Sequence, residues 1–331
     1  MKTLQSFSNG TLGFRRALTA VRMPPPPQLH HKLVNFETEK GNKVDLKAVY
    51  EDSTSSGSSH GTVVGFHGSP GSHKDFKYIR HRLDEMGIRF IGINYPGFKQ
   101  TEGYLGQRFG NVERQRYSDA LLDELDIQGK MIIMAHSRGC ENALITATHR
   151  NPHGLILINP TGLRIHKGSR PKGKLETLSF MHKRLPKRVG DEMLFQLLKS
   201  VGFKVQDGEE AIAAVMGEVR RNRRKIGGKC DLEKQIEYIH KFNEMKTKMF
   251  VTFGGRDHLV EKEIVFEALQ KYQGLKHFDF KKDISEEEKS RILETFKENK
   301  GTSVFVASDN HFQNKKRADL IASAVQTMFM T

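Results

Sequence analysis

The stretch Met131-Ile-Ile-Met-Ala-His-Ser-Arg-Gly-Cys140 joins a short apolar run to the start of a helical pattern. The run 131–135 is bounded by turn residues, which is typical of a strand buried on both faces. The pentapeptide Ala-His-Ser-Arg-Gly at 135–139 follows, and the pattern after it predicts a helix over 138–149. A serine therefore stands at a sharp turn from strand to helix, between two small residues.

Similar apolar runs recur along the chain and alternate with helical patterns, which predicts βαβ units and a parallel sheet. The first two runs are joined through Lys40-Gly41-Asn42 and indicate an antiparallel hairpin. Together the runs predict an α/β fold with an eight-stranded, mostly parallel sheet and helices on both faces. The expected strands are 33–38, 44–50, 62–66, 90–94, 131–135, 155–159, 249–253 and 303–307, and the expected helices are 75–86, 112–125, 138–149, 263–272, 285–299 and 315–328.

One segment, residues 161–229, interrupts the alternation. It carries no strand pattern and predicts several short helices. Asp207 and Glu210 have the spacing of a capping box ahead of one of these helices. We expect this insertion to form a helical lid over the sheet edge, between the two parts of an α/β core, 28–160 and 230–331.

The pentapeptide around Ser137 resembles the nucleophile elbow of the α/β-hydrolase superfamily. In that elbow the serine sits in a strained turn, so the positions two before and two after it must be small for strand and helix to approach. Ala135 and Gly139 meet this requirement, although Ala135 departs from the usual glycine. The resemblance covers residues 33–331 apart from the insertion, and the segment 67–79 is similar to a largely uncharacterised nematode branch of the superfamily.

A serine hydroxyl is a poor nucleophile unless a base takes its proton and an acid holds that base in the correct tautomer. Asp257 stands just after the strand-like run 249–253, and His311 just after the run 303–307. The order Ser137, Asp257, His311 matches the chain order of the superfamily's triad. The resemblance therefore implies these three as the catalytic residues.

Several neighbouring residues compete for these roles. Asp309 is the rival acid, but its place two residues before His311 is expected to point it elsewhere. His258 adjoins the acid and His136 adjoins the nucleophile, yet only His311 follows the last strand. Cys140 is expected to pack behind the elbow as a small buried group.

The loop His67-Gly68-Ser69-Pro70-Gly71 follows another strand-like run. By resemblance, the backbone N–H groups of Ser69 and Arg138 form the oxyanion hole, where the developing negative charge is stabilised. The same resemblance makes His67 and Gly68 structural members of this loop.

The chain has 331 residues, of which 37% are hydrophobic, and a net charge of +15 from 54 Lys and Arg against 39 Asp and Glu. Residues 1–36 contribute +5, and residues 161–229 contribute +10, with 17 bases against 7 acids, so the rest of the chain is neutral. No apolar run approaches the roughly 18 to 20 residues that span a bilayer. With only Cys140 and Cys230, a disulfide framework is excluded and a reducing compartment is favoured.

The basic tail, residues 1–27, ends in the run Pro24–Pro27. It has no acid and carries Arg15, Arg16 and Arg22 among Ser, Thr, Leu and Phe. This composition is typical of a mitochondrial transit peptide, and a disordered basic tail has it as well. The prolines predict a stiff spacer. We expect an intracellular location, mitochondrial or cytoplasmic.

The charge of the insertion is densest at residues 220–225, Arg-Arg-Asn-Arg-Arg-Lys. No aromatic residue is interleaved there for base stacking, so we expect a solvated positive face and no nucleic-acid partner. The segments 175–185 and 193–201 place apolar side chains on one stripe with Lys and Arg between them. This pattern suits a lid resting on a pocket, or peripheral contact with an anionic membrane surface.

These features predict a serine hydrolase that cleaves a carboxylic ester or thioester with an acyl or lipid-like part. A peptidase or amidase would use the same triad, and an inactive ligand-binding or scaffold protein would keep the fold, so both alternatives stay open. Epoxide hydrolases and haloalkane dehalogenases share the His-Gly-x-Pro loop by resemblance but need Asp at the nucleophile position, which Ser137 argues against. No phosphate-binding loop or His or Cys pair at ligand spacing is present, so we expect no cofactor and no metal. The oligomeric state stays open.

Overall fold

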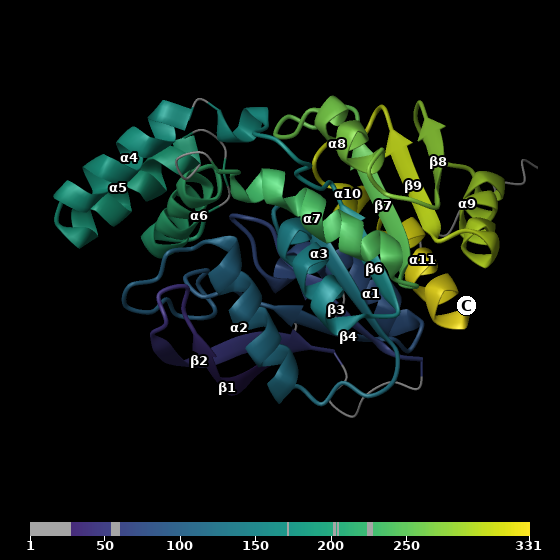
Figure 1. Cartoon of the computed structure of the whole chain (residues 1–331), viewed down its shortest axis with the longest axis horizontal. Coiled ribbons are helices and arrows are strands. Elements are labelled where there is room, and N and C mark those ends of the chain that lie inside the picture. Colours follow the sequence, from purple (N-terminus) through teal and green to yellow (C-terminus); the bar gives the residue numbers. More distant parts are fainter. Residues whose placement is uncertain (1–27, 54–59, 171, 201–202, 204, 224–227) are drawn as a thin grey trace, which may run out of the picture.

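A computed structural model of the chain describes residues 28–53, 60–170, 172–200, 203, 205–223 and 228–331. The expectations for the basic tail lie outside these residues. In the described part, the strands are β1 Leu29–Glu37, β2 Lys43–Asp52, β3 Thr62–Phe66, β4 Arg89–Ile93, β5 Met131–His136, β6 Gly154–Ile158, β7 Lys248–Gly254, β8 Leu275–Phe280 and β9 Gly301–Val306. They form one sheet in the order β1-β2-β4-β3-β5-β6-β7-β9-β8 (Figure 1).

The sheet is mostly parallel, as predicted. β2 pairs antiparallel with β1 and with β4, and all other neighbours are parallel. The predicted hairpin is confirmed, with Glu37 opposite Lys43. Gly41 in its turn has φ +84°, a left-handed conformation that glycine adopts without steric cost.

The prediction of eight strands is wrong, because β8 adds a ninth at the sheet edge beside β9. The side chains of Leu275, Phe278 and Phe280 are partly buried, while the other side chains of this strand are exposed. A polar edge strand of this kind has no continuous apolar run, which was the signal for the strands buried on both faces.

The central strands face two hydrophobic cores. Ile133 and Ala135 of β5 lie in one core, and Ile132 and Met134 lie in the other. The first core is covered by α2 Asn111–Glu124, α3 Gly139–Arg150, α7 Asp231–Glu244 and α8 Lys262–Leu269. The second is covered by α1 Lys77–Glu85, α9 Glu286–Glu298 and α11 Ala318–Met330. Helices on both faces of the sheet are therefore confirmed. Short helices η1 His73–Phe76 and α10 Gln313–Lys316 lie near its carboxyl edge.

Side-chain caps begin two of the helices, and the one at Asp207 tests the predicted capping box. Ser285 and Glu288 form the full reciprocal box at the start of α9. Asp207 accepts from the N–H of Glu210, but the Glu210 carboxylate accepts from the N–H of Gln206, at 2.7 Å, so that box is not reciprocal. Within the described residues, no helix combines the length and apolarity needed to cross a bilayer.

The insertion contributes η2 Lys167–Ser169, α4 Lys172–Arg184, α5 Lys187–Ser200 and α6 Gly208–Arg221. These helices lie together at one end of the molecule, away from β8 and α9 (Figure 1). α4, α5 and α6 pack on one another around a small apolar core of their own that includes Leu194, Leu198, Ala211 and Val215. The charged segment is therefore a helical unit attached beside the sheet.

Candidate active site

Ser137 occupies the turn between β5 and α3. Its φ of +53° is a strained value for a residue with a side chain, and its N–H donates to the carbonyl of Ile158 at 2.9 Å. A Cβ on Gly139 would lie 2.6 Å from the carbonyl oxygen of His67 and closer still to that of Phe66, so only glycine fits there. Ala135 is fully buried in β5. The small residues on either side of Ser137 thus let the helix start directly against the end of β3.

The structure brings Ser137, His311 and Asp257 together from three separate loops at the carboxyl edge of the sheet. The Oγ of Ser137 lies 2.9 Å from Nε2 of His311. Nδ1–H of His311 donates to Oδ2 of Asp257 at 2.6 Å. This hydrogen bond leaves Nε2 unprotonated and able to accept the serine proton.

Asp257 is buried, with 7% of its surface exposed. Burial alone would raise its pKa, but the hydrogen bond from His311 and the N–H groups of Leu259 and Val260 outweigh burial, so the pKa lies below its usual value. Asn159, at φ +47° after β6, donates from Nδ2 to Oδ2 of Asp257 at 3.3 Å. Sequence reasoning missed this asparagine, although its place directly after a buried strand could have indicated it.

The imidazole of His311 is almost fully buried. Burial lowers its pKa, and the Asp257 carboxylate opposes that shift without cancelling it. His136 holds the backbone beside it, because Nε2–H of His136 donates to the carbonyl of His311 at 2.9 Å. Nδ1 of His136 lies 3.4 Å from Oδ2 of Asp75, which belongs to η1. His136 therefore positions the catalytic candidates and is a second residue whose part the sequence did not reveal.

The loop after β3 lies directly against the elbow. A Cβ on Gly68 would sit 3.2 Å from Cβ of Ser137. The N–H of Gly68 donates to Asp75 at 3.1 Å. Burial lowers the pKa of His67 to about 3, and this neutral ring donates from Nδ1 to the carbonyl of Gly68 and accepts from the N–H of Tyr95. His67 thus connects two loops and is remote from proton transfer.

Ser69 and Arg138 both line the inner cavity together with Ser137, and Ser69 also lines the outer cavity. Within the described residues, neither backbone N–H donates a hydrogen bond to another protein group. Two free donors beside a serine are the arrangement that an oxyanion hole requires.

The rival residues have other partners. Asp309 forms ion pairs with Arg317 and Lys316, each at 2.6 Å, and does not contact His311. His258 is exposed, and its ring centroid lies 6.3 Å from that of His311. Among the residues the structure describes, no group of three or more His, Cys, Asp or Glu side chains could hold a metal ion.

Two cavities share Ser69 and Ser137 in their walls. The outer cavity has a volume of about 610 Å³ and is also lined by His311, Phe312 and Glu210. The inner cavity has a volume of about 80 Å³ and lies between the elbow and the insertion. The insertion contributes an apolar wall to it, made of Leu175, Leu198, Phe203, Ala214 and Val215. A substrate whose carbonyl lies at Ser137 can therefore place one part in each cavity.

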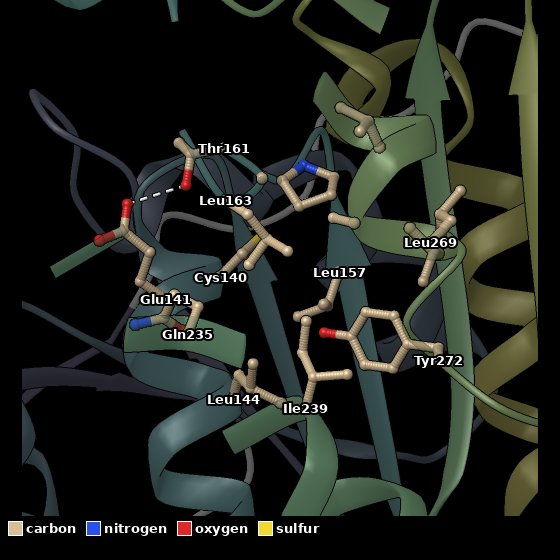
Figure 2. A pocket seen from close by; sticks show the side chains of 15 residues that line it. Cys140, Glu141, Leu144, Leu157, Thr161, Leu163, Gln235, Ile239, Leu269 and Tyr272 are labelled. Carbon is tan, nitrogen blue, oxygen red and sulfur yellow. Dashed lines mark hydrogen bonds between the residues drawn. The ribbon is translucent and has the colours of Figure 1, made fainter. Parts of the chain in front are cut away.

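A third, smaller cavity of about 30 Å³ lies behind the elbow, between α3, α7 and the sheet (Figure 2). Cys140 faces it together with Leu157 and Tyr272. The thiol of Cys140 is buried, and burial raises its pKa, so it is an inert packing group, as predicted. Glu141 at the rim accepts a hydrogen bond from Thr161 at 2.8 Å.

The expectation of a solvated positive face at residues 220–225 is wrong for Arg221, which is 1% exposed. Its Nη1 lies 2.6 Å from Glu141 of α3, and its Nη2 lies 2.7 Å from Glu218 of α6. Nη2–H also donates to Nε2 of His166 at 2.7 Å. The last turn of α6 is thus attached to the elbow helix by the buried ion pair between Arg221 and Glu141.

Solved structures with the same fold include enzymes of different chemistry. An esterase from Thermogutta terrifontis has a TM-score of 0.58 at 14% identity, covering 89% of this chain and 96% of the esterase. The haloalkane dehalogenase DbeA from Bradyrhizobium elkani has a TM-score of 0.59 at 17% identity, covering 92% of this chain and 98% of the dehalogenase. At such identities the likeness shows the fold alone.

Sequence relatives define the family. The uncharacterized protein F35H12.5 of Caenorhabditis elegans is 28% identical over 334 residues, which cover 90% of this chain and 87% of that protein. A family model described as alpha/beta hydrolase of unknown function (DUF1057) matches residues 26–330. That span includes every described strand and the three residues of the candidate triad. The chain therefore belongs to this family of α/β-hydrolases, DUF1057.

Proposed function

We propose that the chain is a serine hydrolase that cleaves a carboxylic ester or thioester. The observation that supports this most strongly is the hydrogen-bonded series from Ser137 through His311 to Asp257, with the serine in a strained turn. Strain at a non-glycine residue persists only where the surrounding structure enforces it, and it gathers at functional sites. A serine, a base and an acid at these distances form the arrangement used for acyl transfer.

The proposed reaction has two halves. Oγ of Ser137 attacks the carbonyl carbon while its proton passes to Nε2 of His311, and His311 then gives that proton to the departing alcohol or thiol. In the second half water attacks the acyl-serine and gives its proton to His311. The bond from the acyl carbon to Oγ then breaks, His311 returns the proton to Oγ of Ser137, and the acid product leaves. Asp257 keeps the imidazole in the required tautomer and stabilises its charged form.

The negative charge on the tetrahedral intermediate needs donors that are already in place. The N–H groups of Ser69 and Arg138 meet this need in the proposal, because both are free of other protein partners in the described part of the chain. Loss of one such donor typically costs about 3 to 4 kcal/mol of transition-state stabilisation.

An acyl or lipid-like substrate fits the walls of the site. Five apolar side chains of the insertion line the inner cavity, beside the charged side chains of Glu218 and Arg221. Because these residues share the cavity with Ser137, we propose that the insertion acts as a lid. An amide would meet the same groups, so the proposal is tested on esters, thioesters and amides in parallel.

The decisive experiment is labelling of purified full-length protein with a fluorophosphonate probe, followed by assays on short-chain 4-nitrophenyl esters. We expect labelling at Ser137 and its loss in Ser137→Ala. Ser290→Ala, on the exposed face of α9, is the matched control and should label normally. Folded wild-type protein that neither labels nor turns over an ester would reject the enzyme and favour a ligand-binding protein.

We further propose that the outer face of the insertion contacts anionic membranes. Phe180, Met181 and Val189 are exposed there, at 53%, 45% and 54%. Exposed Lys183 and Lys187 are near them in the sequence, and the guanidinium of Arg184 lies 4.0 Å above the Phe180 ring. Apolar side chains among Lys and Arg are typical of surfaces that rest on acidic lipid headgroups.

Co-sedimentation with vesicles tests this second proposal. We expect binding to phosphatidylcholine vesicles that contain phosphatidylserine, weaker binding at high salt, and weaker binding of Phe180→Ser. Asp283→Ser, an exposed residue at the opposite end of the molecule, serves as the control. Equal sedimentation with neutral and anionic vesicles would contradict the proposal.

A further inference from the structure

The position of His311 determines which part of a substrate each cavity can hold. Nε2 of His311 lies 2.9 Å from Oγ of Ser137, and in the proposed reaction this atom gives the proton to the departing alcohol or thiol. His311 lines the outer cavity, whereas the lining of the inner cavity does not include it. The leaving group is therefore placed in the outer cavity, and the acyl part in the inner cavity.

The wall of the inner cavity is apolar where the insertion forms most of it. Leu175 comes from α4, Leu198 from α5, and Ala214 and Val215 from α6, and Phe203 lies between α5 and α6. Leu198, Ala214 and Val215 also belong to the insertion's own apolar core. Side chains in a packed core leave few voids and shift little, so we expect the insertion to hold this cavity at a fixed size.

The charged side chains in this wall are bonded to one another. Both carboxylate oxygens of Glu218 accept from Nε–H of Arg221, at 3.0 and 2.9 Å. Burial lowers the pKa of His166 to about 4, so its ring is neutral near pH 7. The guanidinium of Arg138 packs against Gly217 of α6, and its Nε and Nη1 are buried. The described residues of this wall thus offer no free cation to an anionic chain, and an uncharged acyl group fits them better.

The two cavities differ greatly in size. The inner cavity has a volume of about 80 Å³, and the outer cavity has a volume of about 610 Å³. An apolar protein cavity of roughly 150 Å³ holds benzene. By this measure the inner cavity has room for about three or four carbons beyond the carbonyl, while the outer cavity admits a much larger group.

We infer that the inner cavity is the acyl subsite for a short, uncharged chain and that Leu175 and Ala214 of the insertion set its length limit. This inference rests on the proposed hydrolysis at Ser137. It names the substrate class as esters or thioesters in which a short acyl group is joined to a bulky alcohol or thiol.

Leu175 and Ala214 allow the limit to be changed in opposite directions. Leu175 is half-buried and is not part of the insertion's own core, so shortening its side chain should widen the cavity without loosening that core. The side chain of Ala214 is a single methyl group, and this residue is 6% exposed. A larger side chain at this position should therefore occupy space that the acyl chain uses.

The first test measures kcat/KM of the full-length protein on 4-nitrophenyl acetate, butyrate, hexanoate and octanoate. A single methylene in a hydrophobic pocket changes kcat/KM by about tenfold or more. We expect the maximum at butyrate and a value for octanoate that is lower by about tenfold or more. An octanoate value equal to or above that of butyrate, with Ser137 still labelled by fluorophosphonate, would overturn the inference and leave the hydrolase proposal standing. Absence of labelling would instead reject the hydrolase proposal.

A pair of isomeric esters tests which cavity holds the acyl part. Benzyl butyrate carries its ring on the leaving group, and propyl phenylacetate carries the same ring on the acyl group. We expect kcat/KM to favour benzyl butyrate by about tenfold or more, because only the outer cavity has the volume for the ring. Equal values, or a preference for propyl phenylacetate, would overturn the placement of the acyl part in the inner cavity.

Substitutions in the insertion show whether these side chains set the limit. Leu175→Ala should raise the octanoate-to-butyrate ratio of kcat/KM by about tenfold, and Ala214→Leu should lower the butyrate-to-acetate ratio by a similar factor. Leu178→Ala is the matched control and should keep both wild-type ratios, because Leu178 lies on the same helix as Leu175 but packs on the insertion's own core and does not line the inner cavity.

Ratios of kcat/KM do not depend on the fraction of protein that is folded, so a loss of stability in a variant leaves this comparison intact. Unchanged ratios in both Leu175→Ala and Ala214→Leu would overturn the assignment of the length limit to the insertion.

Discussion

The carboxyl edge of the sheet and the underside of α6 both bury polar side chains, but the two regions satisfy them differently. At the sheet edge, the ring of His311 hydrogen-bonds to Ser137 and to Asp257, and its carbonyl accepts from His136. Under α6, the main contacts are ion pairs between Arg221 and two glutamates. One region is a hydrogen-bonded series with a single carboxylate at its end, and the other is a cluster of fixed charges.

This difference matches two different tasks. Proton transfer needs a group whose two protonation states are close in free energy, and a histidine paired with one carboxylate provides that. A buried ion pair keeps its charges, as the pKa of about 2 for Glu218 shows: burial opposes ionisation, but Arg221 and Arg138 favour it more strongly. The sheet edge is therefore suited to chemistry, and the cluster to holding the insertion in place.

Replacing the proposed nucleophile affects the sheet edge alone. Ser137→Ala removes the hydroxyl that lies 2.9 Å from His311 and leaves the ion pairs under α6 intact. We expect kcat on 4-nitrophenyl butyrate to fall by roughly 10⁴-fold or more. The urea midpoint should change little, because one partly buried hydroxyl contributes little to stability. Steady-state kinetics and urea unfolding provide the two measurements, and wild-type turnover in the variant would contradict the assignment.

Two buried aspartates have different expected roles, Asp257 in the proposed reaction and Asp309 in stability. Asp257→Asn removes the carboxylate that fixes the tautomer of His311, and we expect kcat to fall by about 10³ to 10⁴-fold. Asp309→Asn leaves that hydrogen bond in place but breaks the buried pair with Arg317, so it should lower the free energy of unfolding by about 3 to 5 kcal/mol. We expect kcat per folded molecule of Asp309→Asn to stay within tenfold of wild type. Similar kinetic losses in the two variants would show that the residues do not differ in role.

The contrast between the sheet edge and the ion pairs under α6 also explains which features the sequence could predict. Ser137 directly follows β5, while Asp257 and His311 come three and five residues after β7 and β9. These places near strand ends, with the chain order of the family that the sequence resembles, indicated the three residues as a group. Parallel strands end at one edge, which makes short sequence signals predictive of spatial proximity. The hairpin, the helices on both faces and the packing of Cys140 follow from equally local patterns.

Other features depend on tertiary contacts that leave no local signal. Arg221 lies in a run of basic residues that resembles a solvated surface, and only its contact with Glu141, 80 residues away, makes it a buried group. Asn159 and His136 act through backbone and carboxylate neighbours from distant loops. The ninth strand was missed because an edge strand buries only part of its surface.

Breaking the ion pairs affects the other region. Arg221→Met leaves buried Glu141 and half-buried Glu218 without this cation, and we expect the free energy of unfolding to fall by about 3 to 5 kcal/mol. Lys187→Met, on the exposed face of α5, is the matched control and should change it by less than about 0.5 kcal/mol. Urea denaturation followed by circular dichroism measures both. Equal stability of the two variants would contradict the view that this cluster holds the insertion to the core.

Lowering the pH should affect activity through His311 and stability through Glu218. Because burial lowers the pKa of His311 below its usual 6.5, the neutral base persists at pH 6.5, and kcat/KM there should stay above half its plateau. Activity should fall as the pH drops through the pKa of His311, which becomes charged and cannot accept the serine proton. The pKa of Glu218 is lowered from 4.5 to about 2, so the stability from its ion pair is complete above pH 4.5 and is lost between pH 4.5 and 2. A pH-rate profile should therefore have its acid midpoint below pH 6.5, and urea unfolding at each pH follows the ion pairs separately. An activity midpoint above pH 6.5 would contradict a buried His311 as the base.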